Sequence, residues 1–207
     1  MPVLRLPSLP AANSKQAWGN LPGAALSLAI AEAATAAKRF TLLLTADSQS
    51  AERLEQELGF FAPELSVLHF PDWETLPYDQ FSPHQDIISQ RIASLYRLPE
   101  LSRGVLVVPI TTALHRLAPT RFLLGTSLVL DVGQKLNVEQ MRTRLESAGY
   151  RCVDTVYEHG EFAVRGALID LFPMGSELPY RIDLFDDEIE TLRTFDAETQ
   201  RSIDKVE

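Results

Sequence analysis

The residues best placed for chemistry at a phosphate group are the glycines of an early loop. Gly19 and Gly23 precede an alanine-rich segment, as the glycines of a nucleotide-binding P-loop precede its helix. A working P-loop also needs a lysine for the terminal phosphates and a serine or threonine for Mg²⁺. Ala24 and Ala25 stand at those places, and Pro22 lacks a backbone donor. We predict either a degenerate P-loop or an ordinary loop before a helix, with no bound nucleotide cofactor in either case.

Two further sets of residues could hold a metal ion or act as acids and bases. They are the histidines His69, His84, His115 and His159, and the carboxylates Asp183, Asp186, Asp187, Glu188 and Glu190. The histidines lack the close pairing that zinc sites show. The carboxylates could bind Mg²⁺ or Ca²⁺, but acidic residues at a hairpin turn also keep a sheet edge soluble, and we favour that interpretation. We therefore predict no metal site and no catalytic residue.

A third set of residues is suited to binding a protein partner. In the segment YRIDLF, side chains alternate between two faces, and Ile182 and Leu184 share the face that is typical of a core. Arg181, Asp183 and Phe185 share the other face. An aromatic side chain beside an arginine is the composition that protein interfaces favour at their energetic centres.

Charge and composition limit the classes of function that fit this chain. The 207-residue chain has a net charge of −9, of which residues 1–120 carry −2 and residues 121–207 carry −7. Nucleic-acid-binding domains normally show a basic patch, so this balance favours a protein partner over DNA or RNA and leaves room only for a local basic patch. The single cysteine, Cys152, cannot form an internal disulfide, and we expect it to be half-buried. We also find no membrane span or signal sequence and predict a cytoplasmic protein.

The first part of the chain has the pattern of an α/β fold. Residues 1–22 are rich in proline and polar residues and predict a loosely attached arm. In residues 23–120, the expected helices are separated by runs of apolar residues. Within these runs apolar and polar residues do not alternate, which is typical of buried parallel strands. The expected order is a helix at 23–37, a strand at 40–44, a helix from 48 to a stop at Gly59, a strand at 65–70, a helix starting at 82–85, a strand at 104–109 and a short helix near 114–117.

The pattern changes near residue 120. Asn137 is suited to capping one helix, and short strands dominate after it. The expected strands span 152–157, 162–172, 180–185 and 188–195, and the last two are joined by a turn of hairpin length. We predict that residues 121–207 form a small α+β domain.

Several stretches of the chain resemble one family. The stretches DWETLPYD, SPHQDIISQR, EHGEFAVRGALIDLFPMGSELPYR and FDDEIETLRTFD are similar to the N-terminal region of the Mfd family, the bacterial transcription-repair coupling factors. The similarity covers nearly the whole chain after the arm. More distantly, the chain resembles UvrB, a nucleotide excision repair protein whose first domain and UvrA-binding domain follow the same order.

The resemblance implies a degenerate helicase-like parallel-sheet domain followed by a small α+β UvrA-binding domain. The chain departs from UvrB in its degenerate P-loop and in the segment 73–98, which is too short for the DNA-clamping hairpin of UvrB. This implies a non-enzymatic module that recruits UvrA. In the full-length family member, ATP and Mg²⁺ act in translocase domains that displace RNA polymerase stalled at DNA lesions, and other domains contact RNA polymerase and DNA. The resemblance also implies an intramolecular domain that masks the UvrA-binding surface.

The family's UvrA-contacting residues correspond by motif to Arg165, Arg181 and Phe185. The resemblance implies a buried anchor role for Phe185 and bidentate contacts from both arginines to partner carboxylates. Counting alternation through the expected strand 162–172 places Arg165 with Ile169 and Leu171, on the core face. An alternative interpretation of Arg165 is a strand-end arginine paired with a carboxylate of its own chain.

An alternative function is a nucleic-acid-binding or helicase-type ATPase domain that acts directly on DNA. It would require ATP turnover, or an affinity for DNA that falls steeply with salt. The missing P-loop lysine and the acidic balance both argue against it.

Overall fold

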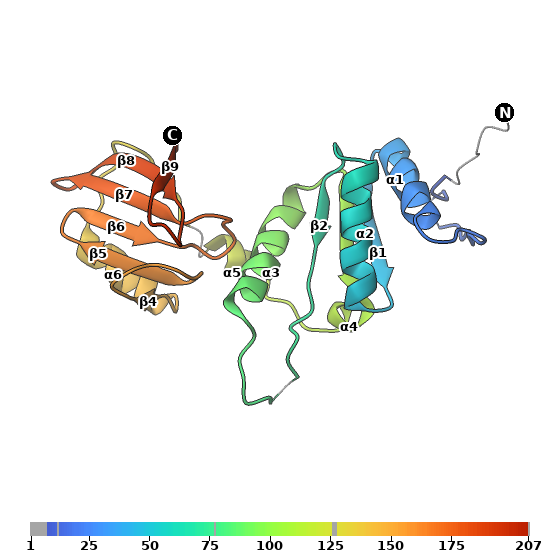
Figure 1. Cartoon of the computed structure of the whole chain (residues 1–207), viewed down its shortest axis with the longest axis horizontal. Helices are drawn as coiled ribbons and strands as arrows, with labels where there is room; N and C mark the ends of the chain where they lie inside the picture. The colour runs from blue at the N-terminus through green and yellow to red at the C-terminus, as the bar shows by residue number, and fades with distance from the viewer. Residues whose placement is uncertain (1–7, 12, 77, 126–127, 207) are drawn as a thin grey trace. The chain divides into compact units, whose positions relative to one another are not determined.

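The computed structural model describes residues 8–11, 13–76, 78–125 and 128–206 (Figure 1). Contacts divide the chain into two units. The first comprises the chain up to Glu74 together with Arg97–Leu117, and the second comprises Thr75–Tyr96 together with the chain from Ala118 onward. The predicted boundaries after residues 22 and 120 stay predictions, but the helix expected to start at 82–85 groups with the second unit. No helix within the described ranges is long and apolar enough to span a bilayer.

The first unit is built on a three-stranded parallel sheet. The strand order is β1 (Phe40–Thr45), β3 (Gly104–Pro109) and β2 (Val67–His69). Helices α1 (Ala25–Ala37) and α2 (Ser48–Phe61) pack on each other and on the central strand. Their shared core consists of Ile30, Ala31, Ala34, Ala51, Leu54, Leu58, Val105 and Val107. The predicted α/β class is confirmed, and α2 runs two residues beyond its expected stop at Gly59.

The prediction that β1 is a buried strand is wrong. Leu42 and Leu44 are 52% and 53% exposed, while Leu43 packs against the core of α1 and α2. β1 lies at one edge of the sheet and only one of its faces meets the helices. The apolar run therefore predicts the strand correctly, but it does not predict that both faces of the strand are buried.

The loop before α1 has no side-chain helix cap. Gly23 adopts a positive φ of 55°, and α1 begins at Ala25 with no side-chain hydrogen bond from Ala24. Within residues 8–11 and 13–24, no strand precedes the helix, whereas a P-loop joins a strand to its helix. This arrangement favours the ordinary-loop interpretation. The parts of the predicted arm at residues 1–7 and 12 lie outside the described residues.

Asp72, at the start of the segment DWETLPYD, is hydrogen-bonded within the first unit. The hydroxyl groups of Thr111 and Thr112 donate hydrogen bonds to Asp72 Oδ2 at 3.0 and 2.7 Å. The backbone N–H of Glu74 donates to Asp72 Oδ1 at 3.2 Å. The two threonines belong to α4 (Ile110–Ala113), which follows β3 directly and replaces the short helix expected near 114–117.

The second unit contains a six-stranded sheet whose strands follow one another in chain order. They are β4 (Arg151–Cys152), β5 (Glu161–Arg165), β6 (Leu168–Leu171), β7 (Tyr180–Phe185), β8 (Glu188–Phe195) and β9 (Ser202–Val206). Neighbours are antiparallel except β4 and β5. Helix α6 (Val138–Ser147), capped by Asn137, covers one face. The core between them contains Met141, Leu145, Phe162, Ile169, Leu171, Ile182, Leu184, Ile189 and Leu192.

Three details of this sheet differ from the predictions. The expected single strand 162–172 is the hairpin of β5 and β6, because Gly166 turns the chain with a φ of 63°. The strand expected at 152–157 is only the two residues of β4, and Cys152 is exposed rather than half-buried. The edge strand β9 was not predicted.

Helix α3 (Gln85–Arg97) is hydrogen-bonded to loops of the second unit. His159 Nδ1 lies 2.8 Å from Asp86 Oδ1, and His159 Nε2 lies 2.9 Å from the carbonyl oxygen of Ser176. The backbone N–H of Gly175 donates to Ser89 Oγ at 2.9 Å. His159 is thus occupied by contacts within the chain.

Across the described residues, no group of three or more His, Cys, Asp or Glu side chains could hold a metal ion. The remaining short helices are Leu98–Glu100 and α5 (Thr120–Gly125).

A pair of glycine substitutions tests the first unit. Gly104 has a φ of 133°, and an added Cβ would lie 2.6 Å from the carbonyl oxygen of Ser66. We expect Gly104→Ala to lower the free energy of unfolding by more than about 1 kcal/mol, measured by urea titration followed by circular dichroism. Gly59→Ala is the control, because its Cβ would meet nothing within 4 Å and the helix should gain up to about 1 kcal/mol. Equal urea midpoints for Gly104→Ala and the parent would contradict the close approach.

The hydrogen bonds of Asp72 predict a dependence of stability on pH. Burial raises the pKa of Asp72, but the hydrogen bonds from Thr112, Glu74 and Thr111 outweigh it and hold the pKa below its ordinary value. A lowered folded pKa gives stability that is present above the unfolded pKa and lost as pH falls through the folded one. We therefore expect Asp72→Asn to lose less stability than the parent on acidification, measured by urea titrations from neutral pH downward. Glu64→Gln, at an exposed site of the same unit, should follow the parent.

Candidate functional site

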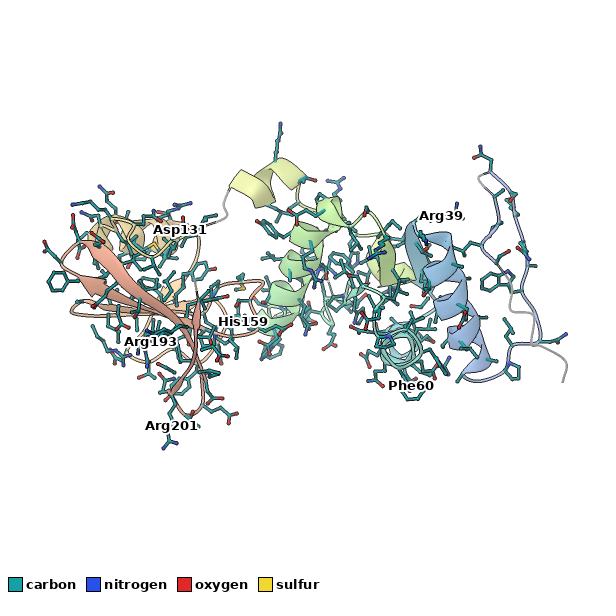
Figure 2. The ribbon with its side chains drawn as sticks, turned by 90° about the horizontal axis from the view of Figure 1, so that it is seen from above. Arg39, Phe60, Asp131, His159, Arg193 and Arg201 are labelled. Atoms are coloured by element: carbon teal, nitrogen blue, oxygen red, sulfur yellow. The ribbon has the colours of Figure 1, made fainter. Side chains whose placement is uncertain are left out.

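The candidate site is the face of the six-stranded sheet that α6 does not cover. Because directly paired residues share a face, the register aligns a row across β5 to β9 on this side. That row is Ala163, Asp170, Arg181, Arg193 and Lys205, and the next row is Arg165, Leu168, Asp183 and Thr191. Figure 2 shows Arg193 on the side of the sheet away from α6. We call this surface, with Phe185, the arginine face.

All three predicted site residues lie on the arginine face. Arg181 and Phe185 lie there as the alternation in β7 predicts. The placement of Arg165 with Ile169 on the core face is wrong. Alternation cannot be counted through the turn at Gly166, and Arg165 pairs with Leu168 on the same side as Ala163.

A buried carboxylate joins the two arginines. Asp170 is fully buried, with 0% of its surface exposed. Arg181 Nε donates to Asp170 Oδ1 at 2.7 Å, and Arg181 Nη2 donates to Asp170 Oδ2 at 2.9 Å. Arg165 Nη2 donates to Asp170 Oδ2 as well. A buried charge is costly without paired hydrogen bonds, so Asp170 fixes where both guanidinium groups lie.

Arg181 is held from three directions. Besides Asp170, its Nη1 donates to the carbonyl oxygen of Gln200 at 3.1 Å. Its Cζ atom lies 4.6 Å from the centroid of the Phe195 ring, within the range of a cation–π contact. The hydrogen bond to Asp170 raises the pKa of Arg181, against the opposing effect of burial. The side chain is 16% exposed. Arg181 therefore makes a bidentate bond within the chain, to Asp170, and the contact with a partner carboxylate that the resemblance implies stays a prediction.

Arg165 and Phe185 are the accessible members of the predicted set. The side chain of Arg165 is 45% exposed, and its bond to Asp170 agrees with the alternative interpretation of a strand-end arginine paired within the chain. Phe185 is 75% exposed at the end of β7. Its position outside the core is confirmed, while its contact with a partner stays a prediction.

The acidic turn beside Phe185 is paired with a lysine. Lys135 Nζ lies 2.8 Å from Asp187 Oδ2, and this hydrogen bond lowers the pKa of Asp187. The backbone N–H of Leu136 donates to the carbonyl oxygen of Asp187 at 2.7 Å. The turn is therefore fastened to the segment that leads into α6.

Sequence reasoning missed two contributors to this face. Asp170 went unnoticed, although an acidic residue flanked by apolar residues within a strand is a signal of a buried ion pair. Arg193 also went unnoticed. Its Nη2 lies 3.9 Å from Asp183 Oδ2, which accepts a 2.6 Å hydrogen bond from Thr191. Arg193 Nε is buried and has no hydrogen-bond partner within the described part of the chain.

Comparisons with known proteins point to one family. Residues 128–207 match the family described as UvrB interaction domain. The chain is 53% identical over 95% of its length to the transcription-repair-coupling factor of Escherichia coli, and it covers 17% of that protein. It is 47% identical over 94% of its length to the factor of Haemophilus influenzae and 33% identical over 91% to that of Staphylococcus aureus, covering 17% and 16% of them. The chain thus spans about a sixth of the length of these relatives.

The role of Asp170 predicts unequal effects of two similar substitutions. Asp170→Asn removes the charge that holds Arg165 and Arg181, and we expect it to lower the free energy of unfolding by about 3 kcal/mol. Asp187→Asn removes an exposed ion pair with Lys135 and should change stability little. Urea titration of both variants measures the difference. Equal, small effects would show that Asp170 does not organise the face.

Proposed function

Because this chain is homologous to the N-terminal region of the transcription-repair-coupling factors, we propose that it is the module through which such a factor recruits UvrA. The observation that carries the proposal is the exposed Phe185 on the arginine face, within the residues that match the UvrB interaction domain. The identity of the partner follows from the family resemblance. UvrA is therefore the first protein to test.

The chemistry of the face suits this role. Phe185 offers a large apolar side chain that would gain from burial in a pocket of the partner, as interface anchors do. Arg165, Arg181 and Arg193 lie on the same face of the sheet as Phe185 and bring positive charge to it, although Phe185 itself adjoins the acidic turn and the chain as a whole carries −9. The arginine face is therefore fitted to a partner surface that combines an apolar pocket with carboxylates.

The wider role is also part of the proposal. In a full-length family member, ATP and Mg²⁺ would act in translocase domains that displace stalled RNA polymerase from DNA lesions. RNA polymerase and DNA would be contacted by those other domains, and a further domain would mask the arginine face until recruitment begins. The module itself would hydrolyse no ATP, since Ala24 and Ala25 offer no group for phosphate or Mg²⁺. The protein would act in the cytoplasm.

The proposal predicts that Phe185 dominates binding to UvrA. Calorimetric titration of purified UvrA into this chain should give saturable binding. Phe185→Ala should weaken it by about 2 kcal/mol or more, which is about 30-fold in Kd, because a central aromatic anchor is lost. The matched control is Phe60→Ala, since Phe60 is 80% exposed on α2 (Figure 2) and should not affect binding.

Two outcomes would contradict the proposal. One is an absence of binding by the parent chain when circular dichroism shows it to be folded. The other is an equal loss of affinity in the Phe185→Ala and Phe60→Ala variants, which would point to a non-specific apolar contact.

A further inference from the structure

The buried centre of the arginine face has more positive than negative charge. Asp170 supplies one carboxylate, and both Arg165 and Arg181 donate to it. Two guanidinium groups and one carboxylate leave one positive charge without a counter-charge inside this cluster. The neighbouring pair of Arg193 and Asp183 is balanced, with 3.9 Å between Nη2 and Oδ2.

The excess charge is accessible only at Arg165. Arg181 is 16% exposed and has its guanidinium group bound by Asp170, Gln200 and the ring of Phe195. Arg165 is 45% exposed, and its one hydrogen bond to the cluster leaves most of its five N–H groups for another acceptor. The two arginines are thus unequal, although they share one face and one carboxylate.

We propose that Arg165 is the charged contact that pairs with a carboxylate of UvrA, and that Arg181 is a positioning residue that holds Asp170 and, through it, Arg165. This inference rests on the proposed function. It separates two residues to which the family resemblance gives the same role.

The register of the sheet sets the distance between Arg165 and Phe185, and so the spacing of the two groups on the partner that would contact them. Arg165 is aligned with Leu168, and Leu168 with Asp183, so Arg165 lies two strands from β7. Phe185 is two residues beyond Asp183. Strands lie about 4.8 Å apart and rise about 3.3 Å per residue, which separates the two Cα atoms by about 12 Å. The fitting partner surface has a carboxylate and an apolar pocket at about that separation.

Charge-preserving substitutions separate the two roles. Lysine keeps the charge of arginine and loses its planar, forked geometry. We expect Arg165→Lys to bind UvrA as the parent does, because a point charge suffices at an exposed contact. Arg181→Lys should lower the urea midpoint and speed dissociation from UvrA, because the bidentate bond to Asp170 is lost. In both variants the dependence of the association rate on NaCl should match that of the parent.

A neutral substitution tests the charge itself. Arg165→Gln should slow association with UvrA several-fold at low salt and flatten the dependence of the rate on NaCl, and it should lower the urea midpoint less than Arg181→Lys does, because Asp170 keeps its bidentate bond from Arg181. Arg142→Gln is the matched control. Arg142 is 47% exposed and paired with one carboxylate, Glu146, but it belongs to α6 on the opposite face of the sheet. It should associate at the rate of the parent.

Stopped-flow association at several NaCl concentrations, with urea titration of each variant, decides between the roles. Parent-like association and salt dependence in Arg165→Gln would overturn the inference. So would Arg181→Lys if it weakened binding without lowering the urea midpoint, since Arg181 would then contact UvrA directly. An absence of binding by the folded parent chain would instead refute the proposed function, so the two failures are distinguishable.

Discussion

The buried carboxylate of Asp170 is the interaction on which the arginine face depends. It lies between apolar neighbours with none of its surface exposed, so its charge must be met by donors inside the sheet. The register supplies them from β5 and β7, the two strands that flank β6. Once Arg181 and Arg165 are bound to Asp170, the face has a fixed charge pattern that a partner can meet without ordering long side chains first.

The other face of the sheet carries the main hydrophobic core of the unit, which offsets the cost of burying this polar cluster. Helix α6 and the alternating apolar residues of β5 to β8 form a continuous core that does not involve the arginines. The arginine face can therefore keep an exposed aromatic residue, Phe185, and an accessible cation, Arg165. Alternation along the strands puts the larger core on one side and the arginines on the other, where Ala163 and Phe195 belong to a second, smaller buried cluster.

The arginine face belongs to the second unit alone. The first unit buries small residues of α1 and α2 against a short parallel sheet, and its loop before α1 lacks the groups that nucleotide chemistry needs. The second unit carries the arginine face and includes α3, which is hydrogen-bonded through Asp86 and Ser89 to loops of its own unit. A binding unit limited to residues after 120 would lack these contacts.

The sequence by itself determined the helices and strands of the first unit up to β3, helix α6, the two faces of β7 and the exposure of Phe185, because these depend on local periodicity and capping. Its motifs also carried the family resemblance. Only the tertiary structure decided that β5 and β6 form a hairpin, that β1 is an edge strand, and that Asp170 binds Arg165 and Arg181. Each of these depends on which strand lies beside which. The pairing of residues 165, 170 and 181 is set by the turns and by the register of the sheet, and the periodicity within a single strand carries no information about that register.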